Sequence, residues 1–490
     1  MDFLFREFCA ANLSEDIKKI VEFSDEEKEN LKDDIEEYII PRLKVFCNQS
    51  TIYYIFEDEY VETEWKDMIS VHYINTSYRT KRTVMRVHLF QEPEMLEDGY
   101  LGFFTLRNIN DVDLMLSYIY PNWKNMLTNL EQECYFITYK KKVHICGKEL
   151  DIYTYPLYVQ DSAVTSCSHA SMISMSKFLK GKYNYQNIRI FDINNSYTYG
   201  RKKIYPTLGL DPLQMLEILD TNGISVDYKL YSDKMQNAVH AHIDFCVESA
   251  LPILLGIHLT SGEEIAEHVI QIVGHTIREN GQKDYIIYDD SGYYIAQKYH
   301  AKNSVASFVD IVTWEEMKEL LSEGKDNECG FIMYPIHEKI YILYDELIGK
   351  HFKPLMDCMS EVKNQSLRIR TLIVDNNLVK EYLNDLLLKE KVVNKDENED
   401  DVRYEEDVER EVERLINKNL PHYIWVLEIH KNNNKLNLIL ADPTLNSTTR
   451  KSIFISSESF TVTKGFSLLN DFGRENIGDR QCALQGLEIM

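Results

Sequence analysis

The sequence predicts an α+β fold in which helices pack on antiparallel sheets. Short apolar or alternating runs of strand length recur through the 490 residues, as at 83–91 and 251–257. An Asn-Gly pair at 280–281 joins two such runs, which is a hairpin signal. A helical pattern begins directly after a polar run that ends at Cys167. We therefore expect a core made of this helix and an antiparallel sheet, with further α/β regions before and after it.

Composition limits the classes of partner. The 490 residues are enough for about two to four domains, and a content of 44% hydrophobic and 11% aromatic residues is ample for real cores. The formal net charge is −25. Such a surface repels phosphate backbones and anionic lipid, so we expect neither nucleic acid nor a membrane as a partner. A basic peptide or a basic protein would be attracted.

The cysteines and the chain start indicate the compartment. Nine cysteines are spread singly with no CxxC pair, which argues against a cysteine-based zinc site and is typical of a reduced, intracellular protein. Charges occur too early in residues 1–7 for a secretory signal. The longest apolar run, near 250–257, has the length of a strand and is too short to span a bilayer. We expect a soluble cytoplasmic protein.

The first region, residues 1–130, has mixed α/β character. Acidic and apolar positions alternate at helical spacing over 14–38. Strand-like runs follow at 50–57, 67–78, 83–91 and 100–107. These patterns carry no recognisable chemistry, so we interpret the region as a packing or recognition domain. Two further strand pairs are expected over 135–158, with a turn at Cys146 and Gly147.

Cys167 is the candidate nucleophile. A turn-prone run from Gln160 leads to it, and apolar residues after it recur at helical spacing. At the first turn of a helix, free N–H groups and the positive end of the helix dipole favour thiolate over thiol. Thiolate is the reactive form of cysteine. The face expected to be buried comprises Ala170, Ile173, Phe178 and Leu179.

His268 is the candidate base. It enters an apolar, β-branched run that ends near Gly274, and a second run over 284–288 leads to Asp289 and Asp290. Pairing these runs as a hairpin brings an acid from the end of the second beside the histidine at the start of the first. A carboxylate there holds an imidazole in the right tautomer and orientation. The predicted order is cysteine on a helix, histidine on a strand, and acid after the next strand.

This order resembles the papain-like cysteine peptidases, and is most similar to the bacterial branch that processes leader peptides. Gln160 lies upstream of Cys167, where the family keeps a glutamine for the oxyanion hole. Residues 209–223 look like the family's helix and glycine turn, and residues 251–257 look like the strand before its histidine. The resemblance covers about 131–335, which we take as a papain-like domain.

Three positions depart from the family pattern. Gln160 precedes Cys167 by seven residues rather than six, and Ser168 stands where a glycine commonly follows the cysteine. Asp289 and Asp290 replace the usual Asp-Pro. Asp289 takes the position of the family's aspartate and is the favoured third member of the triad, with Asp290 as the alternative.

The resemblance implies acyl transfer, most simply hydrolysis of a peptide bond in a peptide or protein substrate. Cys167 attacks the carbonyl, His268 moves the proton, Asp289 orients His268, and Gln160 helps to hold the oxyanion. No metal or organic cofactor is needed. Two alternatives stay open: an amidase, deamidase or transglutaminase-like enzyme on the same fold, and a non-catalytic module that only binds peptides.

Other histidines and loops are weaker candidates. His169 lies two residues from Cys167 and therefore on another helical face, which makes it a poor base. His240 and His242 form an H-x-H pair without the further ligands that a metal site needs. The Tyr-rich loop at 196–205 is more simply a solvated connection than a substrate contact.

The third region, residues 336–490, is expected to be α/β. Its pattern gives a helix at 341–359, a strand at 367–374, a helix at 377–388 and a hairpin over 423–441. The segment 389–414 is dense in charge and is interpreted as a solvated face or linker. The hairpin echoes the one that carries His268, with His422 before it and Asp442 after it, but we treat the echo as structural.

Overall fold

The computed structural model describes the greater part of the chain. The described residues are 5–19, 35–40, 51–60, 84–94, 99–108, 112–120, 133–160, 166–196, 209–231, 236–261, 264–278, 282–290, 309–322, 330–351, 367–377, 379–381, 413, 416–417, 419–431, 434–444 and 454–456. Among the helices of these residues, none combines the length and apolar character needed to cross a membrane.

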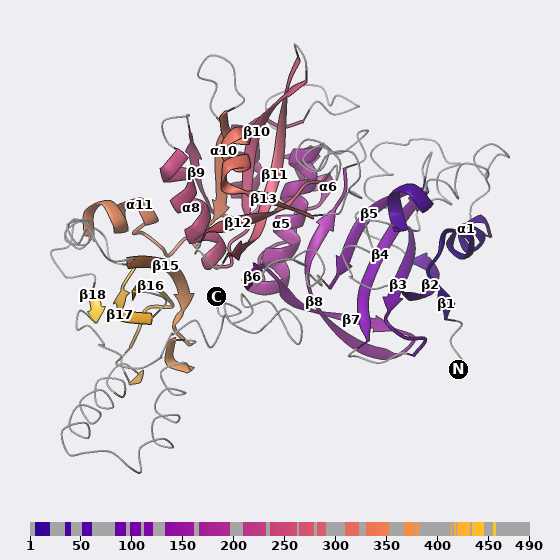
Figure 1. Ribbon diagram of the computed structural model, residues 1–490, viewed down its shortest axis with the longest axis horizontal. Coiled ribbons are helices and arrows are strands. Elements are labelled where there is room, and N and C mark those ends of the chain that lie inside the picture. The colour runs from indigo at the N-terminus through magenta and orange to yellow at the C-terminus, as the bar shows by residue number, and fades with distance from the viewer. Residues whose placement is uncertain are drawn as a thin grey trace. The chain divides into compact units, whose positions relative to one another are not determined.

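The chain forms two compact units, which are described separately. Of the described residues, the first holds those up to Val239 together with Pro252–Pro335, and the second holds His240–Leu251 and those from Ile336 to 456. Helices are few, and the strand pairings of the described residues are antiparallel. The predicted α+β class is therefore confirmed (Figure 1).

The first sheet belongs to the first unit and has the order β1-β2-β3-β4-β5-β8-β7. The runs predicted at 83–91 and 100–107 are strands, and the run at 50–57 becomes a strand that starts three residues later. Cys146 and Gly147, both with positive φ, make the predicted turn between β7 and β8. The predicted strand at 67–78 lies outside the described residues. The strands are β1 (Arg6–Glu7), β2 (Tyr53–Tyr60), β3 (Val84–Phe90), β4 (Tyr100–Asn108), β5 (Val112–Ile119), β7 (Tyr139–Ile145) and β8 (Lys148–Tyr158).

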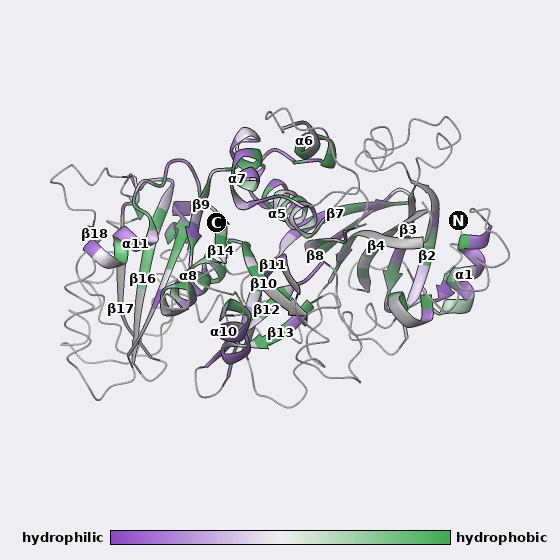
Figure 2. Cartoon of the chain, turned by 90° about the horizontal axis from the view of Figure 1, so that it is seen from above, coloured by the Kyte–Doolittle hydropathy of each residue, from purple (hydrophilic) through white to green (hydrophobic). Residues whose placement is uncertain are grey.

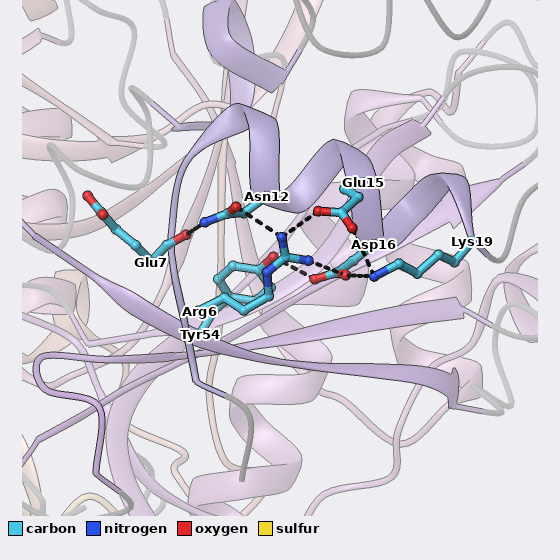
Figure 3. A network of polar contacts seen from close by, with 7 residues as sticks. All are labelled: Arg6, Glu7, Asn12, Glu15, Asp16, Lys19 and Tyr54. Carbon is cyan, nitrogen blue, oxygen red and sulfur yellow. Dashed lines mark hydrogen bonds and ion pairs between the residues drawn. The ribbon is translucent and has the colours of Figure 1, made fainter.

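A polar network connects the helix α1 (Ala10–Lys18) to β1 and β2 at the edge of this sheet (Figure 3). The Tyr54 hydroxyl, on β2, donates to Asp16 Oδ2 at 2.7 Å. Arg6 Nη1 donates to Asp16 Oδ1 at 2.5 Å, and Lys19 Nζ donates to the same oxygen at 2.9 Å. Of the helical pattern predicted over 14–38, the structure describes the end of α1, which begins earlier at Ala10, and a π-helical turn at Ile35–Ile39. Residues 20–34 lie outside the described residues.

The second sheet of the first unit has the order β13-β12-β11-β10-β14-β9, with β6 also paired to β11. The predicted hairpin is confirmed, because β11 and β12 pair in antiparallel register. Figure 2 shows the hydrophobic character of the central strands β10 and β11, whose described residues are mostly buried. The strands are β6 (Glu133–Phe136), β9 (Val226–Leu230), β10 (Ile253–Ser261), β11 (Glu264–Ile277), β12 (Lys283–Tyr288), β13 (Val309–Thr313) and β14 (Phe331–Pro335).

At Gly274, both β12 and β6 pair with β11, and their backbones approach it closely. The register of β11 against β12 shifts between Ile272 and Gly274, and β6 pairs with the same stretch. A Cβ atom at position 274 would lie 2.1 Å from the carbonyl oxygen of Tyr135. Only a residue without a side chain allows that approach.

The helix α5 (Cys167–Tyr183) packs on β8, β11 and β7 of the first unit. Its predicted start at Cys167 is confirmed, with Ser166 as the extended residue before it. The predicted apolar face is buried, but so is the rest of the helix from Ser168 to Leu179. Three further helices of the first unit are α6 (Ile190–Asn195), α7 (Pro212–Thr221) and α10 (Trp314–Ser322).

The second unit contains a four-stranded sheet of order β15-β16-β17-β18 and most of α8 (Gln236–Glu248), which begins in the first unit. Its core includes Trp425, whose Nε1 donates to the Ile342 carbonyl at 2.9 Å. The helix predicted at 341–359 is shorter at its start, with α11 (Tyr344–Glu346) and then a π-helical turn (Leu347–His351). Nearly all of 389–414 lies outside the described residues. The strands are β15 (Leu367–Asp375), β16 (Tyr423–Lys431), β17 (Asn434–Ala441) and β18 (Phe454–Ser456).

Candidate active site

Cys167 is the first residue of α5 and is partly exposed. Its thiol therefore lies where the first free N–H groups of the helix are, at the positive end of the dipole. The rest of the helix is held in a fixed place by buried serine hydroxyls. Ser171, one turn after Cys167, donates to the Val269 carbonyl at 3.3 Å. That bond joins the cysteine-bearing turn to the strand residue directly after His268.

His268 lies on β11, opposite Ile257 of β10, and its side chain is 9% exposed. Its Nε2 donates to Asp289 Oδ1 at 2.9 Å. Its ring also forms a side-chain hydrogen bond with Cys167. Since Nε2 is engaged by Asp289, we infer that Nδ1 is the nitrogen that faces the sulfur. Three segments far apart in sequence are thus joined in one series: thiol, imidazole and carboxylate.

Two acidic residues, Asp289 and Asp290, follow β12 directly and both face His268. Their side chains are 3% and 0% exposed. Asp290 Oδ1 lies 3.9 Å from His268 Nε2, which is ion-pair range but too long for a hydrogen bond. Of the two acids that the sequence left as alternatives, Asp289 makes the direct hydrogen bond.

The charge state of His268 follows from these contacts. Burial alone would lower the pKa of the imidazole. The hydrogen bonds with Asp289 and Cys167, and the negative charge that both partners carry when ionised, outweigh burial and raise the pKa of His268 well above its ordinary value. The imidazolium form is therefore favoured at neutral pH, and a positive ring next to a thiol favours the thiolate.

Gln160 lies two residues beyond the end of β8 and is half-buried. The backbone that leads to it is tied to the site on both sides. The Tyr158 N–H donates to Ser174 Oγ of α5 at 3.1 Å, and the Tyr158 carbonyl accepts from the Tyr288 hydroxyl at 2.5 Å. Tyr288 immediately precedes Asp289. Residues 161–165, between Gln160 and Cys167, lie outside the described residues.

The start of α5 explains the serine at position 168. Ser168 Oγ accepts from the Leu210 N–H at 3.1 Å and lies 3.0 Å from Ser166 Oγ. A hydroxyl here therefore holds the loop that enters α7, a contact that glycine could not make. His169 is buried, and its Nδ1 lies 2.9 Å from Ser166 Oγ.

His268, Asp289 and Asp290 are also the group of described residues that could hold a metal ion. One ligand atom from each lies within 4.8 Å of the others, and all three side chains are buried. Three is the number of ligands that a protein supplies to a catalytic zinc ion. His268 Nε2 and Asp289 Oδ1 are, however, hydrogen-bonded to each other, so a metal ion could bind these two atoms only if that hydrogen bond were broken.

The remaining histidine candidates lie beside separate acids in the second unit. His242 Nε2 lies 3.0 Å from Asp345 Oδ1, and His240 Nε2 lies 4.0 Å from Asp244 Oδ2, so the two rings do not converge on one carboxylate. The echo hairpin also does not reproduce the first one. His422 contacts Asp375 at 3.1 Å.

The acid after the echo hairpin is used locally. Asp442 Oδ1 accepts from the N–H and hydroxyl of Thr444 at 2.8 and 2.6 Å. Of the loop at 196–205, Ser196 alone is described, and its hydroxyl donates to the Asp192 carbonyl at 2.6 Å.

Sequence reasoning missed three residues whose hydrogen bonds tie together the segments that carry Cys167, Gln160 and Asp289. They are Ser171, Ser174 and Tyr288. Serines within a helix give the pattern of a solvated face, so they carried no signal of burial. Neither the protein-family models nor the curated proteins compared with this chain match its sequence.

Proposed function

We propose that the chain is a cysteine peptidase with a papain-like core, in which Cys167, His268 and Asp289 act as a triad. The observation that carries the proposal is the hydrogen-bonded series of thiol, imidazole and carboxylate, contributed by a helix start, a strand and the end of the next strand. A cysteine-bearing helix packed on an antiparallel sheet is the core that the family resemblance implied.

The contacts support a defined division of labour. The Cys167 thiolate attacks the peptide carbonyl and forms an acyl-enzyme thioester, while the imidazolium of His268 protonates the leaving amine. Water then attacks the thioester, with neutral His268 accepting its proton, and the thiolate leaves. Asp289, bonded to Nε2 at 2.9 Å, keeps Nδ1 directed to the sulfur and stabilises the imidazolium.

The oxyanion of each tetrahedral intermediate needs donors beside Cys167. The N–H of Cys167, at the free end of α5, is one donor that points out of the helix start. The Gln160 amide is the second, because its backbone follows the Tyr158 segment that is tied to α5 and to Tyr288. Each such donor typically contributes about 3 kcal/mol to the transition state.

The substrate class is a peptide or a protein segment. Net charge of −25 favours segments that carry Lys or Arg through long-range attraction, which weakens as salt screens it.

Peptide-library digestion tests the proposal. The full chain and its Cys167→Ala variant are incubated with a mixed peptide library, and new chain ends are identified by mass spectrometry. The exposed Cys146, in the turn between β7 and β8, supplies the matched control Cys146→Ala. We expect new ends with the wild type and with Cys146→Ala, and none with Cys167→Ala.

Two results would contradict the peptidase assignment. Release of ammonia or exchange of an amine without chain cleavage would assign a different acyl transfer to the same triad. Tight peptide binding with no covalent Cys167 adduct and no product would assign a binding module.

A further inference from the structure

Asp290 is a buried ionisable group that the triad mechanism does not use. Its side chain is fully buried, and its Oδ1 lies 3.9 Å from His268 Nε2. Asp289 Oδ1 lies 2.9 Å from the same nitrogen. One imidazole therefore has two neighbouring carboxylates, on consecutive residues.

The end of β12 explains how consecutive side chains reach the same ring. Along a strand, neighbouring side chains point to opposite faces of the sheet. β12 ends at Tyr288, and the chain turns at Asp290. Because the alternation stops there, Asp289 and Asp290 can both face β11.

Keeping a second carboxylate in this buried place has a physical cost. Two carboxylates that share a site repel each other, and a buried carboxylate needs a counter-charge. The imidazole of His268 is a group that can carry such a charge, and it lies in ion-pair range of Asp290. The cost is offset when the ring is protonated, since one positive ring then lies beside both acids.

We propose that Asp290 is a second positioning carboxylate for His268, so that a pair of acids rather than one acid holds the imidazolium of the triad. The proposal deepens the proposed function and rests on it. If Asp289 alone held the ring, loss of that acid would leave His268 without a negative partner at the end of β12. If both acids hold the ring, Asp290 still favours the imidazolium when Asp289 is lost.

The charged groups around His268 define what the second acid adds. Cys167 faces the ring from α5, and Asp289 and Asp290 face it from the end of β12. The residue paired with His268 on β10 is Ile257, which does not ionise. An opposite charge within about 4–6 Å of an ionisable group favours its charged form, so removal of Asp290 should lower the titration midpoint of His268.

The first experiment needs no substrate. The full chain in a Cys167→Ala background, with isotope-labelled histidine, is titrated by NMR in the presence of chelator, and His268 is assigned with His268→Gln. Asp290→Asn removes the charge with little change of shape. Asp284→Asn, at the other end of β12 and ion-paired with Arg278 at 2.8 Å, is the matched loss of a buried acid.

We expect Asp290→Asn to lower the His268 midpoint and Asp284→Asn to leave it unchanged. An unchanged midpoint in Asp290→Asn would overturn the proposal, because the acid would then be neutral or too weakly coupled. A wild-type midpoint that changes when Zn²⁺ replaces the chelator, with no effect of Asp290→Asn in chelator, would also overturn it and assign the pair to a metal site.

The second experiment uses hydrolysis. If each acid can support His268, the rate lost in Asp289→Asn/Asp290→Asn exceeds the product of the losses in the two single variants. Losses that simply multiply would overturn the paired role. If the wild type hydrolyses nothing, the proposed function fails, but the NMR titration still decides whether Asp290 holds the imidazolium.

Discussion

Tyr288→Phe removes one oxygen atom that links the two flanks of the candidate site. The Tyr288 hydroxyl donates to the Tyr158 carbonyl at 2.5 Å, and both side chains are buried. Asp289 is the next residue on one side of this bond, and Gln160 is two residues away on the other. The bond therefore fixes Asp289, the proposed acid of the triad, relative to the chain that carries Gln160, the proposed oxyanion donor.

The expected cost has two parts. A hydrogen bond of this kind contributes about 0.5–1.5 kcal/mol net, and a buried carbonyl left without its donor costs about 1–3 kcal/mol. We expect Tyr288→Phe to lower the free energy of unfolding by about 1–2 kcal/mol, measured by urea denaturation. The positional effect is larger for chemistry, because a displacement of about 1 Å can cost a hundredfold in rate.

Tyr54→Phe is the matched control. It removes the same atom from another buried tyrosine, which donates to Asp16 Oδ2 at 2.7 Å (Figure 3). Its strand β2 is separated from β8 by three strands of the first sheet. Both variants should lose stability, but only Tyr288→Phe should slow peptide hydrolysis, by about 10–100-fold. Equal effects of the two variants on hydrolysis would refute the reasoning.

Three further predictions concern the oxyanion donor, the imidazolium and the strand crossing. Gln160→Ala should lower the hydrolysis rate by about 10²–10³-fold while alkylation of Cys167 stays as fast as in the wild type; slower alkylation would show that the residue is structural. His268 has a raised pKa in the folded chain, so its contacts contribute stability that is fully present below about pH 6.5, the unfolded value, and is lost as the pH rises through the folded value. The difference in free energy of unfolding between wild type and His268→Gln, from urea titrations across pH, should therefore shrink with rising pH, and growth would contradict the assignment. Gly274→Ala should lower the free energy of unfolding by more than Gly147→Ala, because its Cβ would lie 2.1 Å from the Tyr135 carbonyl oxygen. A Cβ at Gly147 meets nothing within 4 Å, so that variant costs only about 1–2 kcal/mol for its positive φ. A larger loss for Gly147→Ala in urea denaturation would contradict the packing at β11.

Much of the secondary structure was predictable because it depends on local patterns. The run at 83–91 alternates, the Asn-Gly pair separates two β-branched runs, and both patterns depend on neighbouring residues alone. The start of α5 at Cys167 was also predictable from the change between a polar run and helical spacing. The end of α1 at Lys18 was not, because it falls inside a pattern that still looks helical.

The support of the candidate site could not be read from the sequence. Ser171, Ser174 and Ser176 look like a solvated helix face, yet each is buried because it bonds a backbone group elsewhere: the Val269 carbonyl, the Tyr158 N–H and the Ile188 N–H. Those partners are set by tertiary packing. The sequence offered Asp289 and Asp290 as alternatives, and the approach of both to His268 was not predicted, since strand alternation would put them on opposite faces.

Alkylation of Cys167 at acidic pH tests the central claim most directly. At pH 6 an ordinary cysteine is less than about 1% thiolate, whereas a thiolate–imidazolium pair reacts with iodoacetamide there. Cys146 is exposed and Cys167 is partly buried, so exposure alone favours Cys146. We predict that Cys167 is alkylated at least about tenfold faster than Cys146 at pH 6, and that His268→Ala removes the difference. Faster labelling of Cys146, or a Cys167 rate that His268→Ala leaves unchanged, would contradict an activated thiolate at this site.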